Sequence, residues 1–403
     1  MMSINTHEGN RFRIVLILMI CMILVLSAGL CNCYLQASEE RINSRPKRLS
    51  SRDWMREEKI KAGYLYFYND KSHLKEIKSS GLNTLIVKAW QFDEKQEAKS
   101  LFLMRSWGGA CQANGMHMIA AYNWQPQKEC FRYRSAVFKD GTNAMFSCPL
   151  DKEFWKGHIL KIGRDLSRIS TEDDMSLDAV MLDLEIYGTE YQPTPNKYYT
   201  DTTCYCGNCF SSFFKTMKDS ILIPDVEARD RYQYLKKNGL LEAYRAFLEA
   251  SVAEFAVEYR NEIRSINPEI SFGLYPYSKT KNWVLQTMAR VLGSNDRPVL
   301  LFSVDTYYKG GHASIPRNPQ SVLREERIDG LYIPGYLFRK YPASMVHENI
   351  VYSRMKSDGY FLFKLPQLWS KSLNSSEMLA EGSTQDYWKA ISTANGMKSD
   401  VVE

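Results

Sequence analysis

Two carboxylates stand near the end of one apolar stretch of the chain, in the segment DAVMLDLEIY at residues 178–187. Alternate side chains of a β-strand point to opposite faces, so Asp183 and Glu185 share one face with Met181, and the other face is wholly apolar. The rise of a strand places the two carboxylates about 6–7 Å apart. Charges this close resist ionising together, so one group keeps a proton near neutral pH. The pattern predicts acid–base chemistry, with Glu185 as the proton donor.

The elements that must position these carboxylates are eight short apolar runs, each followed by a stretch with helical spacing. We predict strands at residues 63–68, 83–90, 116–124, 178–187, 270–277, 299–307, 330–337 and 359–365. The clearest helix is expected at residues 240–266, where apolar residues recur at three- and four-residue steps until Asn267-Pro268.

Strands that alternate with helices favour a parallel sheet with right-handed crossovers. An open doubly wound sheet would usually carry a phosphate-binding glycine loop after its first strand, and residues 68–71 contain no glycine. We therefore expect an α/β fold, a (β/α)8 TIM barrel with long cysteine-bearing loops after strands three and four. In such a barrel the C-terminal strand ends form the active site.

Three carboxylates at the predicted strand ends are the catalytic candidates: Glu185, Asp183 and Asp305. Asp305, after strand six, is expected to be either a nucleophile or a hydrogen-bond partner of the substrate, and a salt bridge at the rim is its alternative. The alternative for Asp183 is a structural role as the partner of Lys88 or of a backbone amide.

The same strand ends are rich in aromatic rings, and no histidine lies among them, which disfavours a metal hydrolase. A rim of carboxylates and aromatic rings suits the cleavage of glycosidic bonds, in which one group protonates the leaving oxygen and a second handles the developing cation. The residues predicted to bind the substrate are Lys88, Trp90, Trp124, Tyr187, Tyr275, Tyr307 and Trp369.

Six cysteines belong to the predicted barrel, and five of them lie in the long connections at residues 125–154 and 188–240. In an exported domain, six cysteines permit three disulfides in fifteen pairings. The spacing Cys204-x-Cys206-x-x-Cys209 could instead supply three thiolates to a structural zinc ion, with a fourth ligand from elsewhere. Both interpretations remain open, and no other cofactor is expected.

The N-terminal segment has the layout of a secretory signal, because Arg11 and Arg13 precede an uncharged run at residues 14–30. The run is also near the lower limit of length for a spanning helix, so an uncleaved membrane anchor is the alternative. We predict a signal or anchor at 1–37, a charged linker at 38–60, the barrel domain at 61–395 and a tail at 396–403. The barrel is expected outside the cytoplasm, whether secreted, periplasmic or membrane-anchored.

The net charge of +6 is small for 403 residues and is spread along the chain. This distribution does not indicate a nucleic-acid partner. We expect a carbohydrate partner, and membrane contact only through the N-terminal segment.

The segment DAVMLDLE resembles the strand-four signature of chitinase-like family 18 glycoside hydrolases, D-G-x-D-x-D-x-E. The first Asp, the last Asp and the Glu match, whereas Ala179 replaces the usual Gly and Met181 replaces an acidic or amide residue. The resemblance implies that Glu185 is the proton donor and that Asp183 orients the acetamido group of a substrate.

In the same resemblance, Tyr307 and Trp369 are similar to the family's site Tyr and barrel-floor Trp. A second resemblance covers more of the chain: Cys148-Pro149-Leu150, the DLEIY segment and the Cys-Tyr-Cys-x-x-Cys-Phe segment at 204–210 resemble uncharacterised exported barrel proteins whose glycoside hydrolase activity is inferred.

These observations predict an exported glycoside hydrolase that cleaves a complex or polymeric glycan, with Glu185 as general acid/base. The alternative is a non-catalytic carbohydrate-binding barrel at the cell surface. Met181, in place of an acidic residue, favours that alternative.

Overall fold

The computed structural model describes residues 51–66, 68–88, 96–124, 132–185, 203–217, 223–278, 282–294, 296–307, 310–369 and 378–396. Within these ranges no helix has both the length and the apolar character that crossing a membrane requires. The predicted signal or anchor at residues 1–37 lies outside them.

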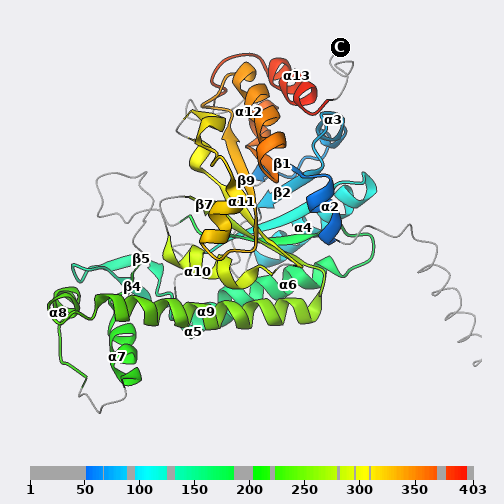
Figure 1. Ribbon diagram of the computed structural model, residues 1–403. Coiled ribbons are helices and arrows are strands. Elements are labelled where there is room, and N and C mark those ends of the chain that lie inside the picture. The colour runs from blue at the N-terminus through cyan, green and yellow to red at the C-terminus, as the bar shows by residue number, and fades with distance from the viewer. Residues whose placement is uncertain are drawn as a thin grey trace, which may run out of the picture. The chain divides into compact units, whose positions relative to one another are not determined.

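Eight parallel strands close into a barrel in the order β1-β10-β9-β8-β7-β6-β3-β2 (Figure 1). They are β1 Ile60–Tyr66, β2 Thr84–Lys88, β3 His117–Asn123, β6 Ala179–Asp183, β7 Ser271–Tyr277, β8 Val299–Ser303, β9 Gly330–Leu337 and β10 Gly359–Phe363. The remaining pair, β4 (Ser135–Val137) and β5 (Asn143–Ser147), forms a small antiparallel sheet in the connection after β3. The predicted (β/α)8 barrel is therefore confirmed.

Two buried clusters divide the strand side chains as their alternation predicts. Met181 belongs to the cluster inside the barrel, with Tyr64 and Phe361. Val180 and Leu182 belong to the larger cluster between the strands and the helices. The face of β6 that carries Met181 therefore continues through Asp183 to the barrel interior, as the pattern of residues 178–187 indicated.

Helices follow the strands and cover the barrel. They are α2 Ser51–Glu57, α3 Leu74–Ser79, α4 Glu97–Ala113, α5 Lys152–Phe154, α6 Lys161–Ser170, α7 Gly207–Thr216, α8 Arg231–Lys237, α9 Leu241–Ile266, α10 Trp283–Leu292, α11 Pro319–Glu325, α12 Ala343–Lys356 and α13 Thr384–Ala394. A π-helical turn, η2 (Trp155–Leu160), joins α5 to α6, and the 3-10 turns include η4 (Asp305–Tyr307) and η6 (Leu365–Leu368).

Helix α9 is the long helix predicted at residues 240–266 and is drawn in green in Figure 1. Its buried positions, Tyr244, Leu248, Val252, Ala256, Tyr259 and Ile263, recur at three- and four-residue steps. The helix ends before Asn267-Pro268, because the residue that precedes a proline is disfavoured in helical conformation.

Helix α2 closes the amino end of the barrel. Trp54 and Met55 are almost fully buried in the interior cluster, and the Trp54 ring stacks on His117 with centroids 3.4 Å apart. His117 is the first residue of β3, so this contact lies at the end opposite Asp183. The folded part thus includes residues 51–60, which the sequence analysis assigned to a charged linker, because these two apolar side chains fill the barrel floor.

Strand β7 departs from simple alternation near its end. The pairing of β7 with β8 shifts register between Leu274 and Tyr277. Tyr275 therefore stays in the interior cluster, whereas Tyr277 joins the outer cluster and packs against Tyr332 with ring centroids 6.1 Å apart. Alternation alone would place both tyrosines on the same face.

His158, in η2, connects the helical layer to the end of β3. Its Nε2 atom donates to the carbonyl oxygen of Asn123 at 2.9 Å, and its ring stacks on Phe154. Burial lowers the pKa of His158 to about 4, with smaller contributions from Arg132 and Lys161, although the bond to Asn123 opposes the shift. The folded protein therefore holds a neutral imidazole.

We expect acid to destabilise the protein through His158. The unfolded residue titrates near 6.5, so as the pH falls from about 6.5 to about 4 the unfolded state binds the proton and about 3 kcal/mol of stability is lost. Urea unfolding at pH 7 and pH 4.5 measures this loss. The loss of stability between the two pH values should be smaller in His158→Gln than in the wild type. His347→Gln, on α12, is the control and should lose as much stability as the wild type. Equal pH dependence in the two variants would contradict the assignment.

Candidate functional site

The carboxyl-terminal parts of β1, β2, β6 and β7, with the turn that follows β8, bring one group of side chains together. We call it the mouth cluster: Tyr64, Lys88, Asp183, Glu185, Tyr275 and Tyr307. The strand register explains why Asp183 and Tyr275 lie side by side, because Asp183 of β6 pairs with Tyr275 of β7. On its other side Asp183 pairs with Asn123 of β3. Glu185 lies two residues beyond the end of β6 and is half-buried.

Asp183 and Lys88 form an ion pair inside the barrel, and their side chains are 1% and 4% exposed. The second carboxylate oxygen of Asp183, Oδ1, accepts a hydrogen bond from the backbone N–H of Glu185 at 2.9 Å. Both structural roles that the sequence analysis gave as the alternative for Asp183 are thus present. Asp183 connects a buried cation to the backbone of the residue predicted to be catalytic.

The electrostatics of the mouth cluster favour a charged Lys88. Burial alone would lower the pKa of this lysine, but the nearby carboxylates of Asp183 and Glu185 outweigh burial and raise it. Burial has the opposite effect on Tyr64. Burial and the carboxylates of Asp183 and Glu185 together raise the pKa of the Tyr64 hydroxyl well above its usual value. Tyr64 therefore remains a neutral hydroxyl below Glu185.

Glu185 is held by a short chain of tyrosines. The hydroxyl of Tyr275 donates to Oε1 of Glu185 at 3.0 Å, and the hydroxyl of Tyr307 lies 3.4 Å from that of Tyr275. Tyr275 and Tyr307 are both buried, so each orients its neighbour from below. The predicted site residues Glu185, Asp183, Lys88, Tyr275 and Tyr307 are thus brought together.

Next to this group, three partly exposed side chains line the opening: Tyr66, Phe363 and Lys364. The Phe363 ring has its centroid 4.9 Å from Tyr64, 6.5 Å from Tyr66 and 6.3 Å from Tyr307. The site prediction missed Phe363, although its place two residues after the inward Phe361 was a usable signal. The Tyr66–Phe363 pair gives the opening an aromatic wall.

Asp305 lies at the same end of the barrel, but β7 separates its strand from β6. It begins η4, and its Oδ1 accepts a hydrogen bond from the Ser278 hydroxyl at 2.9 Å. The structure thus places this carboxylate beside Ser278 at the carboxyl end of the barrel.

Two predicted substrate-binding tryptophans lie elsewhere. Trp124 is 1% exposed and packs edge-on against Phe154 and Trp155, because it continues the outward alternation of Tyr122. Trp369 stacks on His73 with centroids 4.4 Å apart and donates through Nε1 to Glu76. Trp90 and Tyr187 are outside the described residues.

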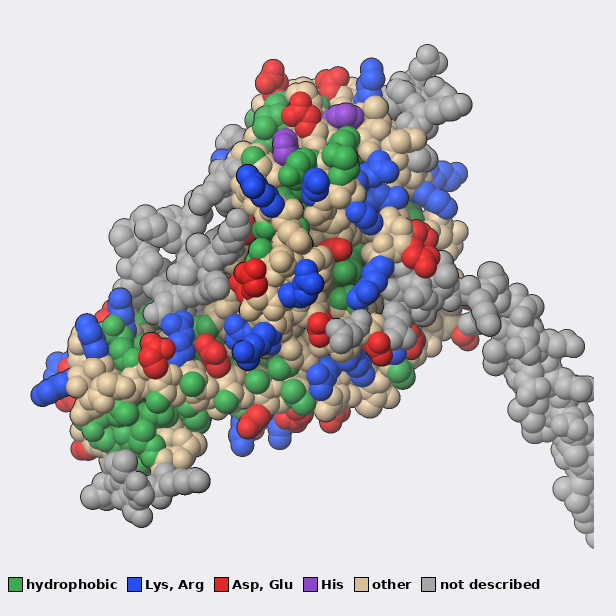
Figure 2. Space-filling model, in the orientation of Figure 1, with side chains coloured by type: hydrophobic (Ala, Val, Ile, Leu, Met, Phe, Trp, Pro, Cys, Tyr) green, Lys and Arg blue, Asp and Glu red, His purple; other side chains and the backbone are tan. Residues whose placement is uncertain are grey.

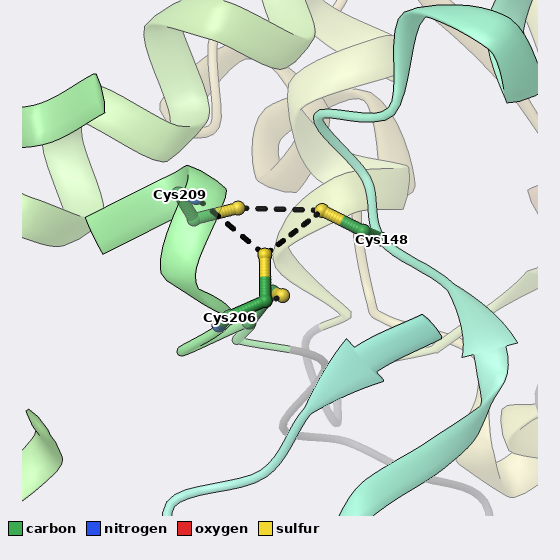
Figure 3. A group of neighbouring side chains, drawn as sticks. Cys148, Cys206 and Cys209 are labelled. Atoms are coloured by element: carbon green, nitrogen blue, oxygen red, sulfur yellow. Dashed lines mark hydrogen bonds between the residues drawn. The ribbon is translucent and has the colours of Figure 1, made fainter. Parts of the chain in front are cut away.

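Four buried cysteines converge on the outer side of the barrel: Cys148, Cys204, Cys206 and Cys209. Figure 3 shows three of them, Cys148, Cys206 and Cys209. Their sulfur atoms all lie within 4.8 Å of one another. The Cys148 sulfur is 3.3 Å from that of Cys209 and 3.7 Å from that of Cys206, far beyond the roughly 2.0 Å of a disulfide bond. These four residues are therefore not joined by disulfide bonds in the structure, and the predicted disulfides are not seen among them.

The geometry of the cysteine cluster fits a tetrahedral metal ion. A zinc ion with Zn–S distances of about 2.3 Å holds its sulfur ligands about 3.8 Å apart. Backbone N–H groups of Cys206 and Cys209 also donate to the sulfurs of Cys204 and Cys206, each at 3.5 Å. Cys148 supplies the fourth ligand that the C-x-C-x-x-C spacing lacked. Of the other barrel cysteines, Cys111 is buried in α4, and Cys130 lies outside the described residues.

The cysteine cluster joins the insertion after β3 to the insertion after β6. Cys148 follows β5, whereas Cys204, Cys206 and Cys209 lead into α7. The hydroxyl of Tyr244, on α9, donates to the carbonyl oxygen of Cys204 at 2.6 Å, and the N–H of Tyr205 donates to that of Val137. The two long loops predicted after strands three and four are thus connected to each other and to α9.

No family model matches the chain and no curated protein matches it. Solved structures do resemble it. The β-galactosidase of the Antarctic haloarchaeon Halorubrum lacusprofundi has a TM-score of 0.52 and 12% identity, over 84% of this chain and 58% of that chain. The β-galactosidase of Bacillus circulans sp. alkalophilus has a TM-score of 0.54 and 13% identity, over 85% of this chain and 56% of that chain.

An exo-β-agarase gives a TM-score of 0.50 and 12% identity, over 81% of this chain and 46% of that chain. The chain thus spans little more than half the length of the β-galactosidases. At these identities the likeness shows the fold alone, which this chain shares with the two β-galactosidases and the exo-β-agarase. The resemblance to the chitinase-like signature stays a prediction, and Met181 lies in the apolar interior cluster.

We expect the Lys88–Asp183 pair to dominate the stability of the mouth cluster. Lys88→Met leaves a carboxylate buried without its cation, which should cost about 3–5 kcal/mol in the free energy of unfolding. Urea unfolding measures the loss, and Lys88→Met combined with Asp183→Asn should recover part of it. In contrast, Arg105→Met at the exposed Arg105–Glu172 pair should cost less than about 1 kcal/mol. A loss at Lys88 no larger than at Arg105 would contradict this prediction.

Proposed function

We propose that the protein is a glycoside hydrolase that acts at the carboxyl end of the barrel. The observation that carries the proposal is Glu185, a partly exposed carboxyl group two residues beyond the end of strand four of the barrel that accepts a hydrogen bond from Tyr275. The barrel of the β-galactosidase and exo-β-agarase structures supports the same class of reaction.

In this proposal Glu185 is the general acid/base that protonates the leaving oxygen of the glycosidic bond. Asp183 is 1% exposed and paired with Lys88, so neither group can reach a substrate without breaking the buried pair. We assign both to positioning: Lys88 fixes Asp183, and Asp183 fixes the backbone of Glu185. Asp305, which is partly exposed, is the proposed second carboxylate.

The aromatic wall suits a sugar substrate. Pyranose rings have apolar C–H faces that pack on aromatic rings, and Tyr66 and Phe363 are partly exposed rings at the opening. Phe363 also contacts Tyr64 and Tyr307 of the mouth cluster. We propose a complex or polymeric glycan as the substrate.

Replacing Glu185 tests the reaction. With the purified full chain and a panel of aryl glycosides and polysaccharides, Glu185→Gln should lower kcat by about 10²–10⁴-fold, because the amide cannot donate or accept the proton. Tyr275→Phe should lower kcat less, about tenfold. Tyr277→Phe is the matched control, because Tyr277 lies on the same strand but its hydroxyl donates to Glu326 and not to Glu185. This variant should keep the wild-type kcat.

Full activity of Glu185→Gln would overturn the catalytic assignment. The alternative, a carbohydrate-binding barrel without catalysis, predicts a different result. Glycans would then bind in an array, no substrate would be hydrolysed by the wild type, and Glu185→Gln would bind as the wild type does. The apolar Met181, inside the barrel below Asp183, is the residue that favours this alternative.

We further propose that Cys148, Cys204, Cys206 and Cys209 hold a structural zinc ion. Four buried sulfurs from two insertions match the number and spacing of ligands in closed tetrahedral sites. The ion would stabilise the two insertions beside the barrel mouth. It takes no part in the proposed reaction, because the mouth cluster contains none of these cysteines.

Metal analysis of the full chain should find about one zinc per molecule, and Cys206→Ser should lower both the zinc content and the melting temperature. Cys111→Ser, which removes another buried thiol, should keep the zinc. If Cys206→Ser does not fold, thiol counting on the denatured wild type still decides the question. A metal-free chain with disulfides among the four cysteines would refute the zinc site.

We also propose that residues 1–37 direct export, so that the barrel acts outside the cytoplasm. The charge layout of Arg11, Arg13 and the apolar run supports this. Recovery of the protein from the cytoplasm alone, with these residues intact, would refute it.

A further inference from the structure

A small cavity opens where β9 and β10 end, next to the aromatic wall. Its volume is about 30 Å³, and it is lined by Leu337, Arg339, Phe363, Lys364 and Gln367. Two of these five residues are cations, and they follow neighbouring strands of the barrel. Phe363 belongs both to this cavity and to the aromatic wall.

Two lysine ammonium groups lie near the Tyr66 ring beside the cavity. The Lys364 ammonium lies 5.4 Å from the centre of the Tyr66 ring, and that of Lys88 lies 5.1 Å from the same ring. Lys88 is paired with Asp183 inside the barrel. Arg339 is exposed at the cavity and Lys364 is partly exposed. On the face of the molecule drawn in Figure 2, basic and acidic side chains are interspersed.

The size of the cavity limits what can enter it. About 30 Å³ is far too small for a sugar ring and suits one small substituent that projects from a ring. Gln367 is 4% exposed, and its Oε1 accepts a hydrogen bond from the backbone N–H of Lys364 at 3.1 Å, which fixes one wall. A ring stacked on Tyr66 and Phe363 could therefore direct a substituent between Arg339 and Lys364.

We propose that this cavity is a subsite for an anionic substituent, so that the glycan substrate is acidic. A carboxylate of a uronic sugar and a sulfate ester share the required chemistry, which is charge-assisted hydrogen bonding to a guanidinium and an ammonium group. The ends of strands seven and eight are also where many barrels bind phosphate groups. The inference rests on the proposed function for its glycan, but the binding event needs no catalysis.

Binding measurements with the full-length Glu185→Gln variant test the subsite without turnover. Calorimetry would compare an oligogalacturonate with its neutral methyl ester, and a sulfated galactan oligosaccharide with its desulfated form. We expect at least one acidic ligand to bind about tenfold or more tightly than its neutral partner, and to weaken as salt is added. The pair that shows the preference identifies the substituent as carboxylate or sulfate.

Charge removal then locates the subsite. Adding Arg339→Gln or Lys364→Gln to the Glu185→Gln variant should each remove most of the preference. Lys389→Gln, at an exposed lysine on α13, is the matched control and should leave it unchanged. Equal affinity for acidic and neutral ligands, or a preference that survives both changes, would overturn the proposal.

The two proposals fail differently. If the wild type hydrolyses neutral and acidic glycans with equal kcat/KM, the subsite is wrong and the hydrolase stands. If Glu185→Gln binds acidic oligosaccharides selectively while the wild type cleaves nothing, the hydrolase is wrong and the subsite stands.

Discussion

The buried ion pair of Lys88 and Asp183 is the constraint on which the mouth of the barrel depends. A charge inside an apolar barrel is tolerated only when an opposite charge and further hydrogen bonds accompany it. Here β2 supplies the cation, β6 supplies the anion, and the remaining carboxylate oxygen is satisfied by the backbone of Glu185. The requirement to keep Asp183 paired therefore also determines where Glu185 stands, and the tyrosines beside it complete the arrangement.

Much of the barrel could be predicted from the alternation of side chains. The run at residues 178–187 showed one apolar face and one face ending in carboxylates, and β6 has that division. Asp183, Tyr275 and Glu185 were predicted because they lie on inward positions at or just beyond strand ends. Tyr307 was predicted as part of strand six but lies in the 3-10 turn η4 after β8. By the same alternation Trp124 points outward, to the helices. It was predicted to bind substrate because it is aromatic, although its position in the strand indicated the outer face. Trp369 follows a 3-10 turn, where alternation carries no information.

Other features depend on contacts that no local pattern contains. The register shift between β7 and β8 separates Tyr277 from Tyr275, and the pairing of the two strands is seen only in the folded chain. Cys148 carries no motif that connects it with Cys204, Cys206 and Cys209, which it meets only in the folded chain. Likewise, the charged segment around Trp54 reads as a linker until the open floor of the barrel is available to receive that ring.

The cysteine cluster has a consequence for the order in which the protein assembles. Cys148 meets Cys206 and Cys209 across 58 and 61 residues of chain, and β6 lies within that interval. Closing a loop of this length carries an entropic cost that must be met before its contacts can form. If the proposed zinc ion joined the sulfurs, the strand that bears Asp183 and Glu185 would be tethered on both sides even while the rest of the chain is unfolded. The ion would then restrict the denatured chain most strongly in the segment that carries the catalytic candidates.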